Sequence, residues 1–471
     1  MTTTPGEAEW APFPDDQPPD DDGPDTEPEA EIPSESPEAD LANARRLAHQ
    51  FGDRLRYVVA WDRWLVWDGT RWKPDDTGQA VRYAKQVADR LPKTTKRGVV
   101  ARTQTRAGIA AMLSLAGTEP QIAVAPSQLD ANPYLLNVTN GTLDLASGQL
   151  QAHNPADLLT KITGAAYNPE AQAPGFAEFL LRVQPDPVMR DFLGRLFGHA
   201  LLGKVVEHVL AILYGTGANG KTTLVEAVTN VFGDYARPVD PGLLIARDSE
   251  SHPTGVAGLF GLRLAITHET DAGRRLAEGT VKRLTGGDKI TARYMRQDFF
   301  DFTPSHSILL HTNHKPAVAG TDEGIWRRLR FVPFPVVIPE VEWDGKLADR
   351  LAAEADGILA WIAAGYRSWQ DRGLAEPEAV TIATAAFRGE SDALGVFLTE
   401  RCRLDAGPHA TVQSRTLFDA WKDWAKRENI DAGTQTAFSR DLTDRGYDKR
   451  KDGLGRMVWT GITLYGDEPG E

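Results

Sequence analysis

The chain of 471 residues has very little cysteine and no long apolar run. Cys402 is the only cysteine, which excludes an internal disulfide and a cysteine-based zinc ribbon and suits a reducing cytoplasm. No run of about 18 apolar residues occurs, so no membrane-spanning helix is expected. No basic segment followed by an apolar core stands at the N-terminus, so no secretory signal is expected. These absences predict a cytoplasmic protein without a membrane partner.

Basic residues are absent from residues 1–40, which hold 14 acidic side chains and nine prolines. Because this tail has almost no aliphatic residues to bury, we expect it to be disordered. The chain has 66 acidic and 52 basic residues, so the part beyond residue 40 holds 52 of each. The net charge of −14 therefore belongs to the tail, and a nucleic-acid partner for the rest is not excluded.

Residues 215–222 read GTGANGKT, a full match to the phosphate-loop pattern G-x-x-x-x-G-K-[ST]. An apolar run before the loop predicts a buried strand, and residues 223–228 predict a helix whose positive end faces the phosphates. This order disfavours a chance glycine-rich turn. Lys221 is expected to reach the outer phosphates, and the Thr222 hydroxyl to ligate Mg²⁺. The predicted ATP-binding residues are Gly215, Thr216, Gly217, Ala218, Asn219, Gly220, Lys221, Thr222 and Thr223.

Two later apolar runs end in polar residues. Residues 262–271 predict a strand that ends in acids, and a strand next to the loop's own strand would place Glu269 beside Mg²⁺ and the attacking water. The alternative is a solvated acid at a strand end. Residues 307–313 predict a strand that ends in Asn313, either as a sensor of the γ-phosphate or as a plain capping residue.

Two basic segments each allow a functional and a structural interpretation. Residues 281–297 predict a hairpin that turns at residues 286–288, and either nucleic-acid contact or a solvated hairpin explains its charge. Residues 324–331 place arginines after a turn, where one could reach the nucleotide of a neighbouring subunit or simply begin an exposed strand. The candidate DNA contacts are Lys289, Arg293 and Arg296.

The N-terminal region predicts a helix over 41–51, a β-meander over 55–72 and helices over 79–116. The four tryptophans of the meander form either a base-stacking platform or, by preference, a core. The helices at 79–116 are basic, with a solvated face favoured over a DNA-facing one. The cations concerned are Lys93, Lys96, Arg97, Arg102 and Arg106.

The C-terminal region predicts helices over 414–428 and 434–445 and a β-hairpin over 446–465, which together are typical of a winged helix. The second helix faces DNA or solvent in this interpretation, and a protein-docking module is the alternative. The residues expected on that helix are Gln435, Ser439, Arg440 and Arg445.

Taken in order, the segments GTGANGKT, LTGGDKITAR, ILLHTNHKP and WRRL resemble the superfamily 3 helicases. The closest subset is the phage/plasmid primase–helicase family, which is related to the poxvirus primase–helicase. The resemblance covers about residues 41–465. It implies an AAA+-like core, a ring (a homohexamer by preference) on single-stranded or forked DNA, and 3′→5′ translocation with ATP and Mg²⁺. It also implies catalytic roles for Lys221, Glu269, Asn313 as sensor, and Arg328, in preference to Arg327, as the finger.

Two departures from the family pattern are visible. His268 stands where many relatives have a second acid, so metal binding would depend on Thr222 and Glu269 or would recruit Asp271. The region before the loop is too short for a polymerase domain, so we expect no primer synthesis and a separate primase or polymerase as partner.

The predicted fold class is α/β, with an AAA+-like P-loop ATPase core, a mixed α+β N-terminal region and a C-terminal winged-helix module. The predicted boundaries are 1–40 for the tail, 41–170 for the pre-helicase region, 171–388 for the ATPase and 389–467 for the winged helix. The predicted function is a replicative DNA helicase of viral or mobile-element type. An AAA+-type ATPase that loads or remodels replication proteins is the alternative, and a small-molecule kinase is disfavoured.

Overall fold

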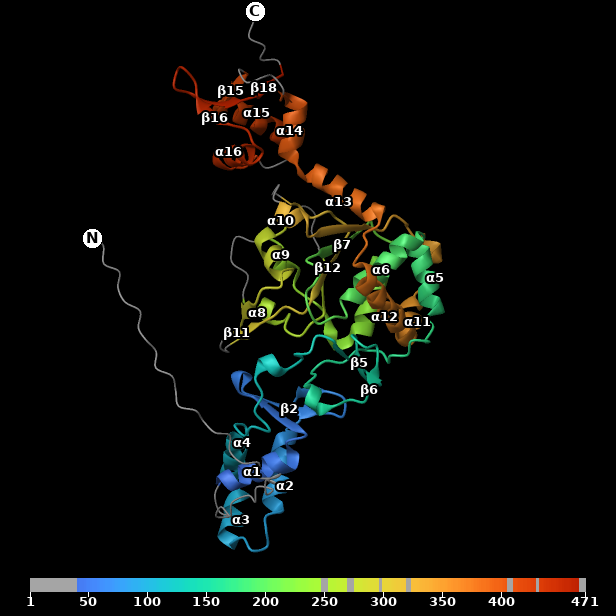
Figure 1. Cartoon of the computed structure of the whole chain (residues 1–471), viewed down its shortest axis with the longest axis vertical. Coiled ribbons are helices and arrows are strands. Elements are labelled where there is room, and N and C mark those ends of the chain that lie inside the picture. Colours follow the sequence, from blue (N-terminus) through green and yellow to red (C-terminus); the bar gives the residue numbers. More distant parts are fainter. Residues whose placement is uncertain are drawn as a thin grey trace, which may run out of the picture.

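The structure is a computed structural model that describes residues 40–246, 253–268, 275–295, 299–318, 323–404, 410–428 and 432–465. Its parts follow one another along the long axis of the molecule (Figure 1). N-terminal helices lie at one end, a nucleotide-binding type of domain lies in the middle, and helix α13 (Glu378–Ser391) leads to a C-terminal module at the other end. Within the described residues, no helix is long and apolar enough to cross a membrane.

The predicted N-terminal elements are confirmed. A three-stranded antiparallel meander joins four helices that enclose a small core around Leu47, Met112 and Ile122. Trp72 is fully buried and its Nε1 donates a hydrogen bond to the Pro155 carbonyl oxygen at 2.9 Å, so it belongs to the core. The elements are α1 (Asp40–Phe51), β1 (Leu55–Val58), β2 (Arg63–Trp67), β3 (Trp72–Pro74), α2 (Gln79–Asp89), α3 (Arg97–Thr103) and α4 (Arg106–Ala116).

The next antiparallel sheet consists of β4 (Leu135–Val138), β5 (Gly141–Asp144) and β6 (Leu150–Gln151). The predicted hairpin at Asn140-Gly141 is the β4–β5 connection. The buried side chains of this sheet belong to the main hydrophobic cluster of the middle domain. The Gly164 N–H also donates to the Val231 carbonyl oxygen at 2.9 Å. Packing therefore continues across residue 170, and the predicted boundary there stays a prediction.

The middle domain contains a five-stranded parallel sheet in the order β13-β7-β12-β9-β8. We expected the strand before Glu269 to adjoin the loop's own strand, and this was wrong. The strand that ends before Asn313 lies between the two, because the chain crosses over before it returns to the sheet. The strands are β7 (Leu210–Tyr214), β8 (Ala236–Pro238), β9 (Leu264–His268), β12 (Ser307–Thr312) and β13 (Leu329–Pro333).

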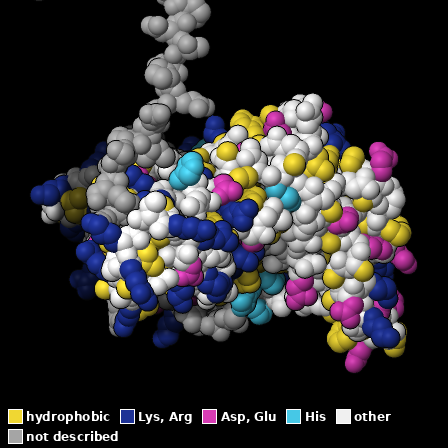
Figure 2. Space-filling model, turned by 90° about the horizontal axis from the view of Figure 1, so that it is seen from below, with side chains coloured by type: hydrophobic (Ala, Val, Ile, Leu, Met, Phe, Trp, Pro, Cys, Tyr) yellow, Lys and Arg dark blue, Asp and Glu magenta, His cyan; other side chains and the backbone are white. Residues whose placement is uncertain are grey.

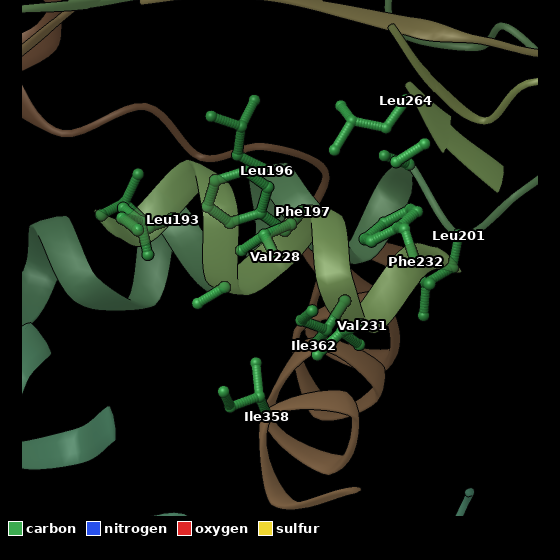
Figure 3. Packing of buried hydrophobic residues seen from close by; sticks show 14 of the residues in the cluster. Leu193, Leu196, Phe197, Leu201, Val228, Val231, Phe232, Leu264, Ile358 and Ile362 are labelled. Atoms are coloured by element: carbon green, nitrogen blue, oxygen red, sulfur yellow. The ribbon is translucent and has the colours of Figure 1, made fainter. Parts of the chain in front are cut away.

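The helix after the phosphate loop, α7 (Lys221–Phe232), is held by packing against helices on one face of the sheet. Figure 3 shows Val228 and Phe232 of this helix among side chains that include Phe197 and Ile362. These partners come from α6 (Pro187–His199) and α12 (Ala355–Arg372), with α5 (Pro174–Val183) and α11 (Leu347–Ala353) nearby. The buried apolar face of α7 fixes the loop at its N-terminus relative to the sheet.

The basic hairpin exists, but its turn lies later than predicted. Strands β10 (Ile290–Ala292) and β11 (Phe300–Phe302) pair antiparallel, so the connection between them spans residues 293–299. Residues 286–288 instead link α9 (Glu278–Leu284) to β10. Helix α9 continues through Lys282 and Arg283 because cations are favoured in a last helical turn. Two short helices, α8 (Pro253–Ala257) and α10 (Glu323–Trp326), complete this domain.

The C-terminal module has its own core around Phe397, Trp421 and Trp459. The predicted order of helix, helix and hairpin is confirmed, and a further strand joins the hairpin in the order β15-β17-β16. The assignment of this arrangement as a winged helix stays a prediction. The elements are α14 (Ala393–Arg401), β14 (Cys402–Arg403), β15 (Thr411–Gln413), α15 (Ser414–Arg427), α16 (Gln435–Asp444), β16 (Lys449–Lys451), β17 (Met457–Thr460) and β18 (Thr463–Leu464).

Candidate nucleotide site and nucleic-acid interface

The phosphate loop lies between β7 and α7, as the sequence predicts. Gly217, Ala218 and Gly220 have φ angles of 106°, 48° and 78°, so the backbone turns through the left-handed region. A Cβ atom at Gly220 would collide with Val183, which excludes a larger residue there. The Ala218 carbonyl oxygen accepts a hydrogen bond from the Ile338 N–H at 2.7 Å and holds the loop against the following chain.

The Lys221 ammonium joins the loop to the end of β12. Its Nζ donates to the carbonyl oxygen of Gly215 at 2.8 Å, to Asn219 Oδ1 at 2.9 Å and to Asn313 Oδ1 at 3.0 Å. Lys221 is only 3% exposed, and burial lowers its pKa to about 8. All three acceptors are neutral, so they orient the ammonium and leave its charge free for an anion. The structure thus brings Lys221 and Asn313, which are 92 residues apart, into direct contact.

A cleft of about 520 Å³ at the loop is also lined by aromatic residues that the sequence reasoning missed. Trp343 is 60% exposed, whereas Phe179 of α5 is buried beside Gly220 of the loop. The Trp343 Nε1 donates to the Ile338 carbonyl oxygen at 3.1 Å, and Arg182 pairs with Glu342 at 2.7 Å across the rim. The cleft therefore combines phosphate donors with an exposed aromatic side chain. No local motif around Trp343 could have indicated this, because many of the other residues that line the cleft come from α5 and the phosphate loop, far away in the sequence.

A second cleft, of about 470 Å³, lies between α7 and the strands β8, β9 and β12. Thr222, Glu226, His268 and His311 are among the residues that line it. The two imidazole rings lie 5.9 Å apart, and burial is the main cause that lowers the pKa of His311. The predicted catalytic Glu269 follows His268 but lies outside the described residues, as do Asp271 and Arg296.

One side-chain oxygen of the kind that magnesium prefers borders the loop. Thr222 is exposed in the first turn of α7 and lines both clefts. In the part of the chain that the structure describes, no cluster of three or more His, Cys, Asp or Glu could hold a metal. Mg²⁺ in nucleotide sites takes one or two protein oxygens and completes its shell with phosphate and water. The hydroxyl of Thr222 would supply one such oxygen. The second predicted ligand, Glu269, lies outside the described residues.

Arg327 and Arg328 lie at the opposite edge of the sheet from the loop. Arg328 directly precedes β13, and its carbonyl oxygen accepts from the Leu210 N–H at the beginning of β7. The loop follows the other end of β7, a strand length of about 16 Å away. The Arg328 side chain is half-buried and donates to the Gly324 carbonyl oxygen at 2.6 Å, whereas Arg327 is exposed. Neither arginine borders the loop of its own chain.

The two described candidates for DNA contact lie at the hairpin. Lys289 is exposed directly before β10. The Arg293 guanidinium lies over the Phe299 ring at 4.8 Å from its centroid. Phe299 and Met295 are 59% and 72% exposed, so cations and apolar side chains share the hairpin connection. This combination suits a single nucleic-acid strand, whose backbone is charged and whose bases are flat.

Two family profiles match this chain. The one described as "D5 N terminal like" matches residues 44–185, and the one described as "Family of unknown function (DUF5906)" matches residues 213–328. The first covers the N-terminal region and the helix before the loop. The second covers the sheet from β7 to Arg328. Together they span the elements that build the candidate site.

Several viral proteins are similar to the chain. The putative helicase L207/L206 of Acanthamoeba polyphaga mimivirus is 28% identical over 321 residues, which are 63% of this chain and 33% of that protein. The putative helicase 022R of Frog virus 3 is 26% identical over 52% of this chain and 27% of its own length. The putative primase C962R of African swine fever virus is 25% identical over 63% and 34%. The chain thus spans between 27% and 34% of the length of these relatives.

Among solved structures, the apo C-terminal region of NrS-1 aligns with 89% of this chain and 99% of its own, at 11% identity and a TM-score of 0.49. The two matched domains are typical of the superfamily 3 helicase region of viral and phage primase–helicases, and the similar viral proteins are putative helicases and primases.

Proposed function

We propose that the chain is an ATP-dependent replicative DNA helicase of viral or mobile-element type, which translocates as a ring on single-stranded DNA. The observation that carries the proposal is the contact of Lys221 with Asn313 at the carboxyl edge of a parallel sheet. That contact couples the phosphate loop to the neighbouring strand. A protein that only stores a nucleotide has no need of such a contact. A motor protein must change conformation according to whether the γ-phosphate is bound.

In this proposal the chain's own residues act on the terminal phosphate as follows. The loop N–H groups and Lys221 bind the phosphates and neutralise charge that develops during transfer. Glu269 orients the attacking water and accepts its proton. Thr222 and Glu269 would hold Mg²⁺, which supplies further neutralisation of phosphate charge when bound. Trp343, an exposed aromatic residue that lines the same cleft, would contact the base.

The sensor role of Asn313 follows from a competition for Lys221. A γ-phosphate draws the ammonium toward itself because it carries charge and the amide oxygen does not. Asn313 then turns its amide to the phosphate or the water, and the end of β12 moves with it. Loss of the phosphate restores the contact of 3.0 Å.

In a ring, the arginines of one subunit would act at the nucleotide site of the adjacent subunit. Arg328 lies too far from its own loop to act in cis, which supports a finger that serves the adjacent subunit of an AAA+-like homohexamer. The hairpin with Lys289 and Arg293 would line the central channel and hold one strand through phosphate contacts. A separate primase or polymerase is the expected partner.

The deciding experiment measures unwinding of a forked duplex together with ATP hydrolysis with and without single-stranded DNA. We expect DNA to stimulate hydrolysis and ATP to drive strand separation with 3′→5′ polarity. Stimulation without unwinding would favour the rival function, an ATPase that loads or remodels replication proteins. If DNA did not change the rate of hydrolysis, both the helicase and the loading ATPase would be contradicted. A small-molecule kinase would then be the favoured function.

The hairpin is tested by the variant Lys289→Ala/Arg293→Ala. Because its contacts are ionic, single-strand affinity should fall and the salt slope of binding should flatten by about one unit for each phosphate that the variant no longer binds. Basal hydrolysis without DNA should survive, since both residues lie outside the phosphate loop. If affinity and slope were unchanged, the DNA site would be assigned to the C-terminal module. Lys449, Arg450 and Lys451 would then be substituted next.

A further inference from the structure

The helices of the N-terminal unit carry a concentrated positive charge that the proposed function does not use. Residues 79–106 hold eight lysines and arginines and one acid, Asp89, although the chain beyond residue 40 is balanced overall. Solvated helices usually intersperse the two signs, because like charges closer than about 10 Å repel one another at physiological salt. The excess here is therefore a local feature that needs its own explanation.

The fold places all eight cations on the outside. Helix α2 turns Ala80, Ala84 and Val87 toward the small core and leaves its charged residues exposed. Figure 2 shows lysine and arginine side chains gathered on this end of the molecule. We name this surface the N-terminal basic face. It consists of the exposed residues Arg82, Lys85, Arg90, Lys93, Lys96, Arg97, Arg102 and Arg106.

Within residues 79–106 the sequence offers a single acid for eight cations. Arg102 pairs with Asp40 at 2.9 Å, at the beginning of α1. Asp89, the one acid within the stretch, accepts a hydrogen bond from Gln104 Nε2 at 3.0 Å. The self-repulsion of the face costs folding free energy unless an anionic partner compensates it.

We propose that the N-terminal basic face binds the sugar–phosphate backbone of DNA, as a second contact separate from the hairpin. Five of the cations lie on the packed helices α2, α3 and α4, and the other three lie on the connection between α2 and α3. A nucleic acid presents evenly spaced phosphates to such an array. Exposed neutral donors between the cations, such as Thr94 and Gln104, suit phosphate oxygens as well. The face lies in a different part of the molecule from the hairpin (Figure 1). The inference rests on the proposed function only in that the protein acts on DNA.

The test compares two full-length variants that each lose three exposed cations. The first is Lys85→Gln/Lys93→Gln/Arg97→Gln on the face. The matched control is Lys204→Gln/Arg372→Gln/Lys422→Gln, whose residues are exposed elsewhere. Affinity for a mixed-sequence single strand is measured against salt. A third variant, Lys85→Arg/Lys93→Arg/Arg97→Lys, keeps the charge and distinguishes weaker phosphate binding from a damaged fold.

We expect the first variant to bind about fivefold more weakly or worse at low salt, with a slope reduced by about two units. The control and the charge-keeping variant should bind as the unchanged protein does, and basal hydrolysis should be equal in all. Equal affinity and slope in the first variant and the control would overturn the proposal. A rise in DNA affinity would also overturn it, because the face would then oppose DNA binding. If the unchanged protein bound no DNA, the proposed function would fail as well.

Discussion

At the scale of single residues, the site depends on how one ammonium is shared. Lys221 is buried and held by three neutral oxygens, so its proton is less firmly bound than that of a surface lysine. The same contacts aim it at the phosphates and link it to Asn313. Removal of this one charge should therefore affect binding, hydrolysis and coupling together.

The first prediction separates binding from chemistry. Lys221→Ala should lower ATP hydrolysis by about a hundredfold or more while the fold is kept, because direct stabilisation of the transferring phosphate is lost. Glu269→Gln should still bind ATP but not turn it over. Steady-state hydrolysis and nucleotide binding are measured, with thermal unfolding as the control. Near-normal hydrolysis by Glu269→Gln would identify Asp271 as the candidate carboxylate.

The second prediction concerns pH. Without nucleotide, the pKa of Lys221 is about 8, lowered by burial, and a bound phosphate should raise it because an anion favours the charged form. Affinity for ATP should thus be constant below pH 8 and should fall up to about tenfold per pH unit above it. For stability the sign is opposite, since the unfolded lysine binds its proton more tightly and unfolding free energy rises with pH above 8.

The measurement is ATP affinity between pH 7 and pH 9.5 by calorimetry. Lys221→Arg is the matched control, because a guanidinium stays protonated over this range and should remove the slope. A slope that survives in Lys221→Arg would assign the titration to another group, with His311 excluded by its lowered pKa.

At the scale of elements, two helices that pass very close together support the phosphate loop. Helices α6 and α12 meet at Gly194 and Gly365, where a Cβ atom added at Gly365 would collide with the Gly194 backbone. Both helices also pack under α7 (Figure 3). The glycines let the helix backbones approach, and this approach determines where the loop lies relative to β12.

The third prediction tests this contact. Gly365→Ala should lower the free energy of unfolding by about 1–3 kcal/mol, because two helix backbones must separate to admit the methyl group. Nucleotide affinity should fall as well, since α7 shifts with them. Urea unfolding and ATP binding are measured. Gly389→Ala is the control, because a Cβ atom there meets nothing within 4 Å. Equal stability of both variants would mean that the helices adjust freely.

At the scale of the whole molecule, one chain does not complete its own catalytic site under the proposed function. Arg328 stands at the amino edge of the sheet and the phosphate loop at the carboxyl edge. A ring solves this by placing the edge of one subunit against the cleft of the next. The N-terminal and C-terminal parts extend from the two ends of the middle domain (Figure 1).

The fourth prediction follows from that arrangement. Arg328→Ala should be inactive alone, and mixtures with Lys221→Ala should recover part of the hydrolysis. A Lys221→Ala subunit still donates its arginine, and an Arg328→Ala subunit still has an intact loop. Hydrolysis is measured over mixing ratios in rings shown to contain both variants. Absence of recovery at every ratio would argue for a role in cis or for Arg327.

The amino-acid sequence by itself determined the phosphate loop, the helices and most strands, because each depends on neighbours within a few residues. The conformations of Gly217 and Gly220 and the apolar run of β7 are local properties of this kind. Only the tertiary structure decided that β12 lies between β7 and β9, that the hairpin connection spans 293–299, and that Trp343 faces the cleft. It also brought Asn313 to Lys221 and carried Arg328 to the far edge. These facts depend on the order in which the strands pack and on contacts between residues many positions apart, which no local pattern encodes.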